Sequence, residues 1–258
     1  MEFNRKAAIA EAFGKAASKY DQHAEFQRQV GRELMAKMPR DLTGYKVLDI
    51  GCGTGYFSEL LAQRGAEVTA ADLSADMLEQ AKFRCGSSVA HYQQADAENL
   101  PFGDSVFDFA FSSLALQWCE DLSKPLKELK RVTKPGGSVL FSTLLDGSLH
   151  ELKLSWSKID THQHVNDFLT EKEIKIALAQ SDIQKHHLDL RSIRMWYSSA
   201  FQLMRDLKGI GATHVRGRSH GLMKKRTLLD VENEYQKFKG EEGQLPATYN
   251  VCLGAINL

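Results

Sequence analysis

The stretch from Lys46 to Ala62, KVLDIGCGTGYFSELLA, constrains the fold more than any other part of the chain. Its first residues, Val47 to Ile50, form a short apolar run without a breaker, which is typical of a buried strand. Three glycines follow at alternate positions: Gly51, Gly53 and Gly55. Apolar residues then recur at helical spacing from Phe57 to Leu61. The stretch predicts a strand, a glycine turn that a ligand can approach closely, and a helix whose N-terminus faces that ligand.

The spacing of the glycines decides between ligand classes. Tyr56 stands where the dinucleotide fingerprint G-x-G-x-x-G requires its third glycine, so that fingerprint is absent. The run from Asp49 to Gly55 instead resembles the first motif of class I S-adenosylmethionine-dependent methyltransferases. A carboxylate such as Asp49 accepts a hydrogen bond from a methionyl ammonium, directly or through water, and would repel a pyrophosphate. The alternative is a tight strand-helix turn without a ligand.

Two acidic residues further along the chain support this resemblance. Asp72 follows an expected strand at 67–71, near the position where an acidic residue binds ribose hydroxyls, although it is also suited to a helix start. Asp96 opens the segment DAENLPF, which resembles the family's D-x-x-x-L-P-F segment and implies a contact with the adenine amino group. The alternative for Asp96 is a solvated loop residue. The predicted cofactor-binding set is Asp49, Gly51, Gly53, Gly55, Asp72, Leu73, Met77, Asp96, Ala97 and Ser112.

Strand and helix patterns alternate through the first half of the chain. Further strands are expected at 89–94, 105–112 and 138–144, which gives the βαβαβ order of a doubly wound parallel sheet. Two late strands, at 187–196 and 248–256, are expected to pair as an antiparallel hairpin at the sheet edge, with the helices between them forming a lid. The resemblance implies a Rossmann-like α/β fold with a mostly parallel seven-stranded sheet and helices on both faces. We expect one domain over 1–258, divided into an N-terminal helical cap (1–40), a cofactor-binding core (41–145), helical segments and lid with one strand (146–246), and a final strand (247–258).

Composition excludes some classes of protein. The 258 residues hold 33 Lys and Arg against 33 Asp and Glu, so the net charge gives no argument for binding to nucleic acid or membrane. No apolar run approaches the length of a membrane span, and the first residues are too polar for a secretory signal. The cysteines form no C-x-x-C pair and are expected to be free thiols of a cytoplasmic protein. A monomer is favoured.

Three segments carry a sharper resemblance: Ala12–Ala24 (AFGKAASKYDQHA), Leu114–Cys119 (LALQWC) and Arg205–His214 (RDLKGIGATH). Together they are similar to the malonyl-acyl-carrier-protein O-methyltransferases of biotin synthesis, over about Ala7 to Ile256. That resemblance implies methyl transfer from S-adenosylmethionine to the free carboxylate of malonyl carried on acyl carrier protein. The products would be S-adenosylhomocysteine and a methyl ester, whose masked charge lets the fatty-acid machinery build the pimeloyl unit.

The chemistry of this reaction needs few groups. A malonyl carboxylate, with a pKa of ~3–4, is ionised at neutral pH and is already a nucleophile, so neither a general base nor a metal is expected. His162, His164, His186 and His187 are interpreted as surface histidines rather than metal ligands. Tyr20 is suited to donate its O–H or to place its ring near the sulfonium. The predicted catalytic residues are Tyr20, Gln117, Lys208 and His214, and the predicted substrate- or carrier-binding residues are Trp118, Arg205, Thr213, Arg216, Arg218, Lys224 and Lys225.

Alternatives remain for several of these assignments. Arg205 and Lys208 also fit the solvated face of a lid helix. The segment from His214 to Arg226 is basic and contains no Asp or Glu. Such a segment suits an acidic carrier protein as a partner, or it is an ordinary basic helix start. It suits nucleic acid less well, because no aromatic residues lie between its charges. Two other functions stay open: a class I methyltransferase for a free small molecule, such as a quinone carbon or a small carboxylic acid, and a non-catalytic cofactor-binding regulator.

Overall fold

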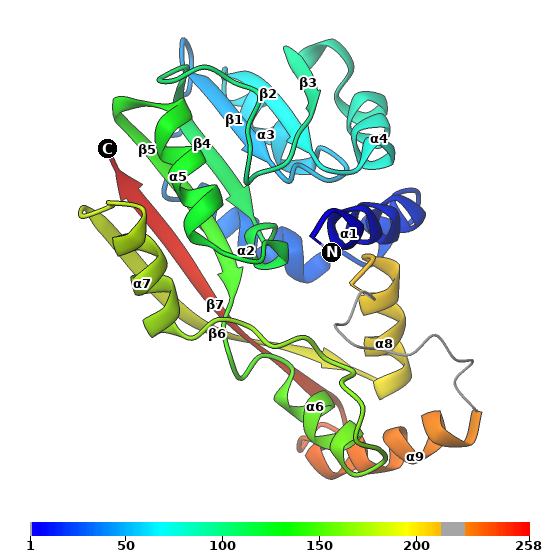
Figure 1. Ribbon diagram of the computed structural model, residues 1–258. Helices are drawn as coiled ribbons and strands as arrows, with labels where there is room; N and C mark the ends of the chain where they lie inside the picture. The colour runs from blue at the N-terminus through cyan, green and yellow to red at the C-terminus, as the bar shows by residue number, and fades with distance from the viewer. Residues whose placement is uncertain (1, 213–224) are drawn as a thin grey trace.

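The computed structural model describes residues 2–212 and 225–258, and within them seven strands form one sheet (Figure 1). The strands are β1 (Lys46–Ile50), β2 (Glu67–Asp72), β3 (His91–Gln94), β4 (Phe107–Ser113), β5 (Thr133–Leu144), β6 (His186–Tyr197) and β7 (Leu245–Asn257). Their order is β3-β2-β1-β4-β5-β7-β6. The first five strands are parallel, and β7 runs antiparallel between β5 and β6. The mostly parallel seven-stranded sheet and the late antiparallel hairpin are therefore confirmed.

Helices cover both faces of this sheet. The described helices are α1 (Glu2–Ala16), α2 (Glu25–Met35), α3 (Tyr56–Gln63), α4 (Ala75–Cys85), α5 (Ser123–Val132), α6 (His150–Ser157), α7 (Glu171–Gln180), α8 (Ala200–Gly209) and α9 (Lys225–Tyr235), with short 3-10 turns η1 (Tyr20–Gln22), η2 (Gly86–Ser88), η3 (Leu116–Trp118) and η4 (Gln236–Phe238). Successive side chains of a strand point to opposite faces, so Val47 of β1 packs with α2, α3 and α4, whereas Leu48 and Ile50 pack with α5 and α7.

Local sequence signals explain where several elements begin. The hydroxyl of Ser74 accepts from the Met77 amide and caps α4. Thr170 and Glu173 form a capping box at the start of α7. Strand β5 begins at Thr133, five residues before the expected start at 138. Thr133 already pairs with Phe107 ahead of a register shift, which is why the strand starts earlier.

Helices α8 and α9 lie, in chain order, between the two strands of the terminal hairpin, β6 and β7. Strands β6 and β7 pair along their whole length, from His186 opposite Ile256 to Tyr197 opposite Leu245. Figure 1 shows α6, α8 and α9 at the end of the molecule away from the C-terminus of β7. The buried Tyr235 of α9 donates from its hydroxyl to the Pro246 carbonyl at 2.8 Å, which fastens α9 to β7.

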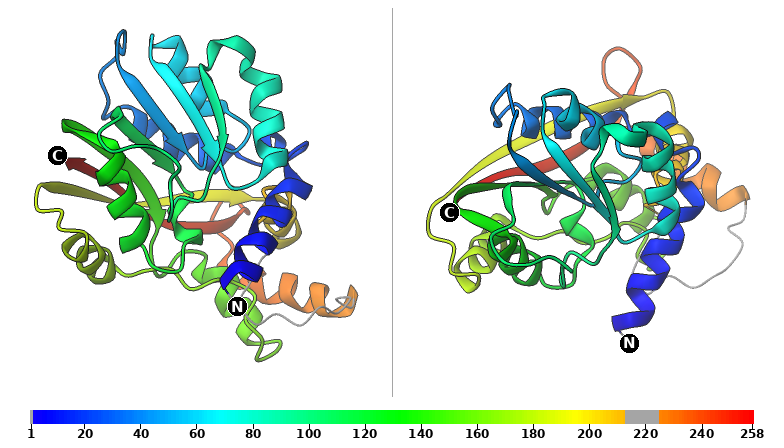
Figure 2. Two further views of the ribbon diagram at one scale, coloured as in Figure 1. Left: turned by 45° about the horizontal axis from the view of Figure 1, so that its top comes forward. Right: turned by 90° about the horizontal axis from the view of Figure 1, so that it is seen from above.

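The N-terminal segment packs against the parallel half of the sheet. Helix α1 lies beside α4 in both views of Figure 2, and a Cβ built on Gly14 of α1 would meet the Asp76 carboxylate of α4 at 2.4 Å. On its other side, a Cβ on Gly211 would meet the backbone of Ala12 and Phe13 at 3.0 Å. Glycines at these two contacts let α1 lie close to both α4 and the end of α8.

Candidate functional site

A cavity lies where β1, β2 and β4 end, the edge at which open parallel sheets bind their ligands. It holds about 810 Å³ of empty space. Its lining comes from α1, η1, the glycine turn, the segments after β2 and β3, and the end of β4. The residues are Lys6, Ile9, Phe13, Tyr20, Ile50, Gly51, Gly53, Asp72, Leu73, Met77, Ala95, Asp96, Ala97, Ser113, Leu114, Ala115, Leu116, Trp118 and Cys119. Most of the predicted cofactor-binding residues are therefore brought together here.

The glycine turn crosses the floor of this first cavity. Gly51, Gly53 and Gly55 all have positive φ, of 72°, 54° and 80°. The amide of Gly51 donates to the Ala71 carbonyl at 2.8 Å, which holds the turn against the end of β2. Gly55 does not line the cavity. A Cβ there would meet Cys85 Sγ at 2.9 Å and Ala81 at 3.0 Å, so Gly55 instead permits close packing of α3 on α4.

Alanine at Gly51 is expected to cost more stability than alanine at Gly53. Both substitutions incur the left-handed backbone cost of about 1–2 kcal/mol. Only Gly51→Ala also creates a clash, because its Cβ would lie 2.3 Å from Ala115 Cβ, whereas no atom of the described residues lies within 4 Å of a Cβ on Gly53. Overpacking of this kind adds about 1–3 kcal/mol. Urea unfolding of the two variants measures the difference.

The double variant Gly51→Ala/Ala115→Gly is the matched control for this clash. It removes the Cβ that the new methyl group meets, so its free energy of unfolding should return to about that of Gly53→Ala. Equal stability of the two single variants would contradict the steric account.

Asp72, at the end of β2, is bonded to the turn that it faces. Its carboxylate accepts from the Gly53 amide at 2.9 Å and from the Ser74 amide at 2.8 Å. Burial raises the pKa of Asp72, and the hydrogen bonds from the Ser74, Gly53 and Leu73 amides oppose that rise. Asp72 therefore couples the geometry of the glycine turn to the start of α4, and it lines the cavity as predicted.

Asp96 also lines the cavity, but the protein already engages both of its oxygens. Lys6 of α1 donates to Oδ2 at 2.6 Å, and the Glu98 amide donates to Oδ1 at 3.0 Å. The same Lys6 ammonium also contacts Glu98 Oε2 at 2.7 Å. Burial lowers the pKa of Lys6, but its hydrogen bonds to the two carboxylates outweigh burial and raise it overall. Sequence reasoning missed Lys6, because its partners lie some 90 residues away in the chain.

Asp49 and Ser112 lie behind the cavity rather than in its lining. Asp49 is 2% exposed and shares the α3 face of β1 with Val47, so its Oδ2 accepts from the Ser58 hydroxyl at 2.6 Å. Burial raises the pKa of Asp49 to about 7, the Ser58 bond opposes this rise, and the nearby Asp72 charge adds to it. Ser112 is fully buried in β4, and its neighbour Ser113 takes the lining position. Asp49, Gly55 and Ser112 therefore lie outside the lining of the first cavity, and their predicted role in cofactor binding stays a prediction.

The segment around η1 forms part of the wall of the first cavity, through Tyr20. The Asp21 carboxylate accepts from the Thr54 hydroxyl at 3.0 Å and from Arg84, and Arg84 also donates to the Thr54 carbonyl at 2.9 Å. These bonds hold Tyr20 over the glycine turn. Burial, together with the charges of Asp72 and Asp21, raises the pKa of Tyr20 far above neutrality. Tyr20 therefore keeps its proton and can act as a hydrogen-bond donor, not as a base.

A second cavity adjoins the first and shares Phe13, Tyr20, Leu114 and Trp118 with it. The rings of Phe13 and Trp118 meet edge to face at 5.2 Å in the shared wall. About 700 Å³ of empty space lies within the second cavity. Its remaining lining residues are Phe26, Gln27, Gln117, Leu144, Leu149, His164, Val165, Asn166, Phe168, Leu207, Ile210, Ala212 and Tyr249. The two cavities can therefore hold two ligands whose reacting ends meet near Tyr20 and Trp118.

Helix α8 turns a different face to this cavity than the sequence predicted. Leu207 and Ile210, the residue after the helix, line the cavity, whereas Arg205 and Lys208 are exposed and line neither cavity. Residues three apart share one face of a helix, so an inward Leu207 turns Arg205 and Lys208 toward solvent. Arg205 and Lys208 thus have the positions of the alternative, a solvated helix face, and their direct contact with the substrate stays a prediction.

Predicted residues Gln117 and Trp118 do reach the second cavity, through the turn η3. Lys225 is exposed at the start of α9. The remaining candidates lie outside the described residues: Thr213, His214, Arg216, Arg218 and Lys224.

Several residues of the second cavity were missed by sequence reasoning. The interpretation of His164 as a surface histidine is wrong, since its side chain is only 9% exposed and lines the cavity. Gln27, Phe168 and Tyr249 come from three distant parts of the chain. The sequence signal that could have pointed to His164 is its four-residue spacing from Asp160, to which its ring is hydrogen-bonded.

The described residues contain no group of three or more His, Cys, Asp or Glu side chains placed to hold a metal ion. Within residues 2–212 and 225–258, no helix is both long and apolar enough to cross a membrane.

Comparison with known proteins agrees with this fold and site. The model of a family described as "Methyltransferase domain" matches residues 48–141, which span the strands and turns around the first cavity. The structure is similar to that of the YcgJ protein of Bacillus subtilis, with a TM-score of 0.62, 17% identity, and coverage of 89% of this chain and 97% of that one. Sheet order, glycine turn and family match together define a class I, S-adenosylmethionine-dependent methyltransferase.

Curated relatives narrow the class further. The malonyl-acyl-carrier-protein O-methyltransferase of Serratia marcescens is 44% identical over 97% of this chain and 95% of its own length. That of Salmonella typhimurium is 42% identical over 97% of each chain. The chain belongs to the malonyl-acyl-carrier-protein O-methyltransferase family.

Proposed function

We propose that this chain transfers a methyl group from S-adenosylmethionine to the free carboxylate of a malonyl group carried on acyl carrier protein. The observation that carries the proposal is the pair of adjoining cavities with a shared wall at Tyr20 and Trp118. One cavity has the lining for a nucleoside, and the other has room for an acyl chain. Membership of the family supplies the identity of the substrate.

The first cavity has features that fit the cofactor. Asp72 offers a carboxylate to the two ribose hydroxyls, and Asp96 lies beside Leu73 and Ala97, which provide apolar walls for adenine. The open space above Gly53 leaves the backbone of the turn accessible to the amino-acid end. When bound, S-adenosylmethionine supplies an activated methyl group on a cationic sulfonium. Asp49 contributes negative charge beneath the turn rather than a direct contact.

The residues of the shared wall position the reacting groups and exclude water. A carboxylate with a pKa of ~3–4 is ionised at neutral pH, so no residue has to remove a proton before attack. Tyr20 keeps its proton and can donate a hydrogen bond. Phe13 and Trp118 keep the passage between the cavities apolar. Catalysis then rests on in-line placement at about 3–3.5 Å and on desolvation.

Docking of the carrier protein is proposed on sequence grounds. Acyl carrier proteins are expected to be acidic, and the segment from His214 to Arg226 is basic. Its residues Arg216, Arg218 and Lys224 lie outside the described residues, and Lys225 is exposed. The helices between β6 and β7 would serve as the lid over the acyl chain. A reducing compartment, the cytoplasm, agrees with the four free cysteines.

Mass spectrometry of the acyl carrier protein tests this function. The protein is incubated with S-adenosylmethionine and malonyl-loaded carrier, and acetyl-loaded carrier is the matched control without a carboxylate. The expected result is a gain of one methylene mass on the malonyl carrier alone, with a slower rate at high salt. Absence of this gain, with cofactor binding measured separately, would contradict the proposal and favour a small-molecule substrate.

A further inference from the structure

His164 occupies an unusual position for a histidine that is not part of the cofactor site. It lies in the segment between α6 and α7, and its side chain forms part of the wall of the second cavity. Its Nε2 atom lies 3.0 and 3.1 Å from the two carboxylate oxygens of Asp160. Its ring stacks on the buried Trp156 of α6, with centroids 3.6 Å apart and planes 12° from parallel. The imidazole is therefore fixed on one edge and one face.

These contacts leave one ring nitrogen for a ligand. Asp160 engages Nε2, and among the described residues Nδ1 has no hydrogen-bond partner. Burial would raise the pKa of Asp160, but the hydrogen bonds from the His162 amide and the His164 ring outweigh burial and hold the pKa below its usual range. Asp160 thus stays a carboxylate, which accepts a hydrogen bond from Nε2 and leaves Nδ1 as the free nitrogen of the ring.

Few side chains in the described wall of the second cavity can carry a charge, so Nδ1 of His164 is important for the binding of an anion. Among the described lining residues of the second cavity, the ionisable side chains are Tyr20, Tyr249 and His164. Burial raises the pKa of both tyrosines far above neutrality, so they stay uncharged. Of these residues, His164 alone is able to present a positive charge to a bound acid. An anionic group that enters this cavity needs such a partner, because burial of an unpaired charge is costly.

Two amides in the same cavity also indicate a polar ligand. The side-chain carbonyl oxygens of Gln27 and Gln117 are buried and have no hydrogen-bond partner in the described part of the chain. Buried polar atoms in native proteins are nearly always hydrogen-bonded, and exceptions occur at functional sites. These two oxygens are acceptors, so they suit N–H or O–H donors of a ligand, whereas its carboxylate needs a donor from elsewhere in the wall.

We propose that protonated His164 binds the free carboxylate of the acyl substrate through Nδ1, with Asp160 as its positioning residue. This inference rests on the proposed function and identifies how that substrate is recognised. One carboxylate oxygen accepts from Nδ1–H, and the other stays free to attack the methyl group. Esterification removes the negative charge, so the product loses this charge-assisted contact and its release is favoured. Neutral His164 donates from Nε2 to Asp160 and presents a lone pair at Nδ1, which repels the carboxylate.

Binding to the unmodified protein gives the first test. With S-adenosylhomocysteine present, the Kd of malonyl-loaded carrier is measured by calorimetry at about pH 6 and about pH 8.5. Loss of the His164 proton should raise this Kd at least tenfold, whereas the Kd of acetyl-loaded carrier should not change. Equal pH dependence for the two carriers would overturn the inference.

Substitutions give a second test, with His162→Gln as the matched control at an exposed neighbour. His164→Gln should lower kcat/KM on malonyl carrier by roughly 10- to 100-fold, mainly through KM, and should abolish its decline at alkaline pH. Affinity for S-adenosylhomocysteine should match that of the wild type. A His164→Gln enzyme with the wild-type KM and pH profile would refute the role of His164. Wild-type protein that fails to methylate malonyl carrier would instead refute the proposed function.

Asp160→Asn separates a positioning role from a purely structural one. The amide oxygen still accepts from Nε2, so the ring keeps its orientation, but the negative charge beside it is lost. KM for malonyl carrier at about pH 6 should therefore rise less than in His164→Gln, with unchanged affinity for S-adenosylhomocysteine. A KM as high as that of His164→Gln would show that holding the ring by a hydrogen bond from Nε2 is not enough.

Discussion

Replacing Asp72 with alanine is expected to lower the affinity for S-adenosylmethionine roughly a hundredfold. The carboxylate lines the first cavity, and it also holds the Gly53 and Ser74 amides at 2.9 and 2.8 Å. The substitution removes hydrogen bonds to a charged group, each worth about 1.5–3 kcal/mol, and loosens the turn against which the ligand lies. Two effects on one site make this the largest expected loss of binding.

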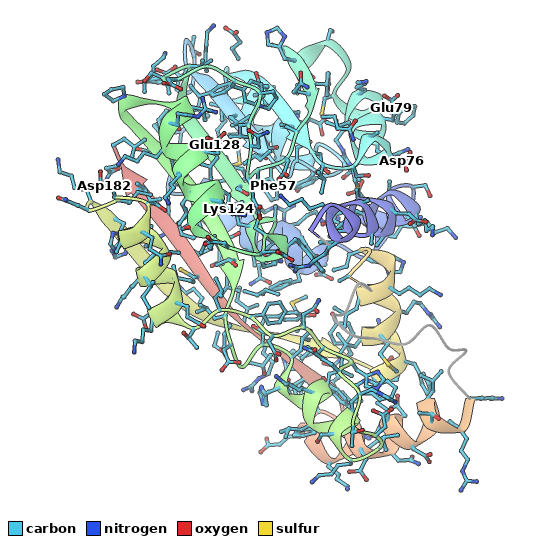
Figure 3. All side chains as sticks on the ribbon, viewed as in Figure 1. Phe57, Asp76, Glu79, Lys124, Glu128 and Asp182 are labelled. Carbon is cyan, nitrogen blue, oxygen red and sulfur yellow. The ribbon has the colours of Figure 1, made fainter. Side chains whose placement is uncertain are left out.

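Isothermal calorimetry with S-adenosylmethionine measures this loss. Glu79→Ala is the matched control. Glu79, labelled in Figure 3, is an exposed acid on α4, and its carboxylate pairs with Lys82 at 2.7 Å. Like Asp72→Ala, Glu79→Ala removes one carboxylate, but Glu79 does not line the first cavity. Asp72→Asn separates charge from shape, since its amide oxygen can still accept one backbone bond. Unchanged affinity in Asp72→Ala would remove this residue from the cofactor site.

Replacing Asp49 with asparagine is expected to stabilise the folded protein at alkaline pH. Burial raises the pKa of Asp49 to about 7, so the folded state binds a proton that the unfolded state, with a pKa near 3.8, releases. Wild-type stability therefore falls as pH rises from about 4 to 7. Asparagine has no charge to bury and can still accept the Ser58 bond. Its advantage in the free energy of unfolding should grow by about 2 kcal/mol between pH 5 and pH 8.

Urea unfolding without cofactor at both pH values measures this growth. Asp108→Asn is the control with the opposite sign, because Asp108 on the neighbouring β4 pairs with Lys134 at 2.8 Å. Its bonds to Lys134 and the Lys46 amide outweigh burial and lower the pKa of Asp108. Asp108→Asn should therefore lose stability at pH 8. If Asp49→Asn gains nothing between pH 5 and pH 8, the carboxylate is not buried as a charge.

Three aspartates, Asp49, Asp72 and Asp96, show how far the cofactor site could be predicted from the sequence. Asp72 is the last residue of β2 and Asp96 lies two residues after β3, and parallel strands bring their carboxyl ends to one edge of a sheet. Local pattern alone therefore places both in the first cavity, together with Gly51 and Gly53. Asp49 lies within β1, where the pleat sends alternate side chains to opposite faces. Its position against Ser58 depends on which face α3 covers, a fact that the motif does not contain.

The second cavity could not be predicted in the same way. Its wall combines Gln27, His164, Leu207 and Tyr249, which are distant in sequence and meet only through packing. Neither hydrophobic periodicity nor glycine spacing encodes such contacts. The orientation of α8 is a further case, since Leu207 faces inward because α8 packs on the rest of the molecule, and Arg205 and Lys208 then face solvent.

By itself, the sequence determined the strand-turn-helix unit, the parallel sheet around it and the acids of the first cavity. These features follow from backbone preferences and from side-chain alternation over short stretches. Tertiary structure alone decided which helix faces point inward, that Lys6 pairs with Asp96, and that Asp160 and Trp156 hold His164 beside the second cavity. Those contacts depend on how distant segments bury their apolar surface together, which is a property of the whole chain.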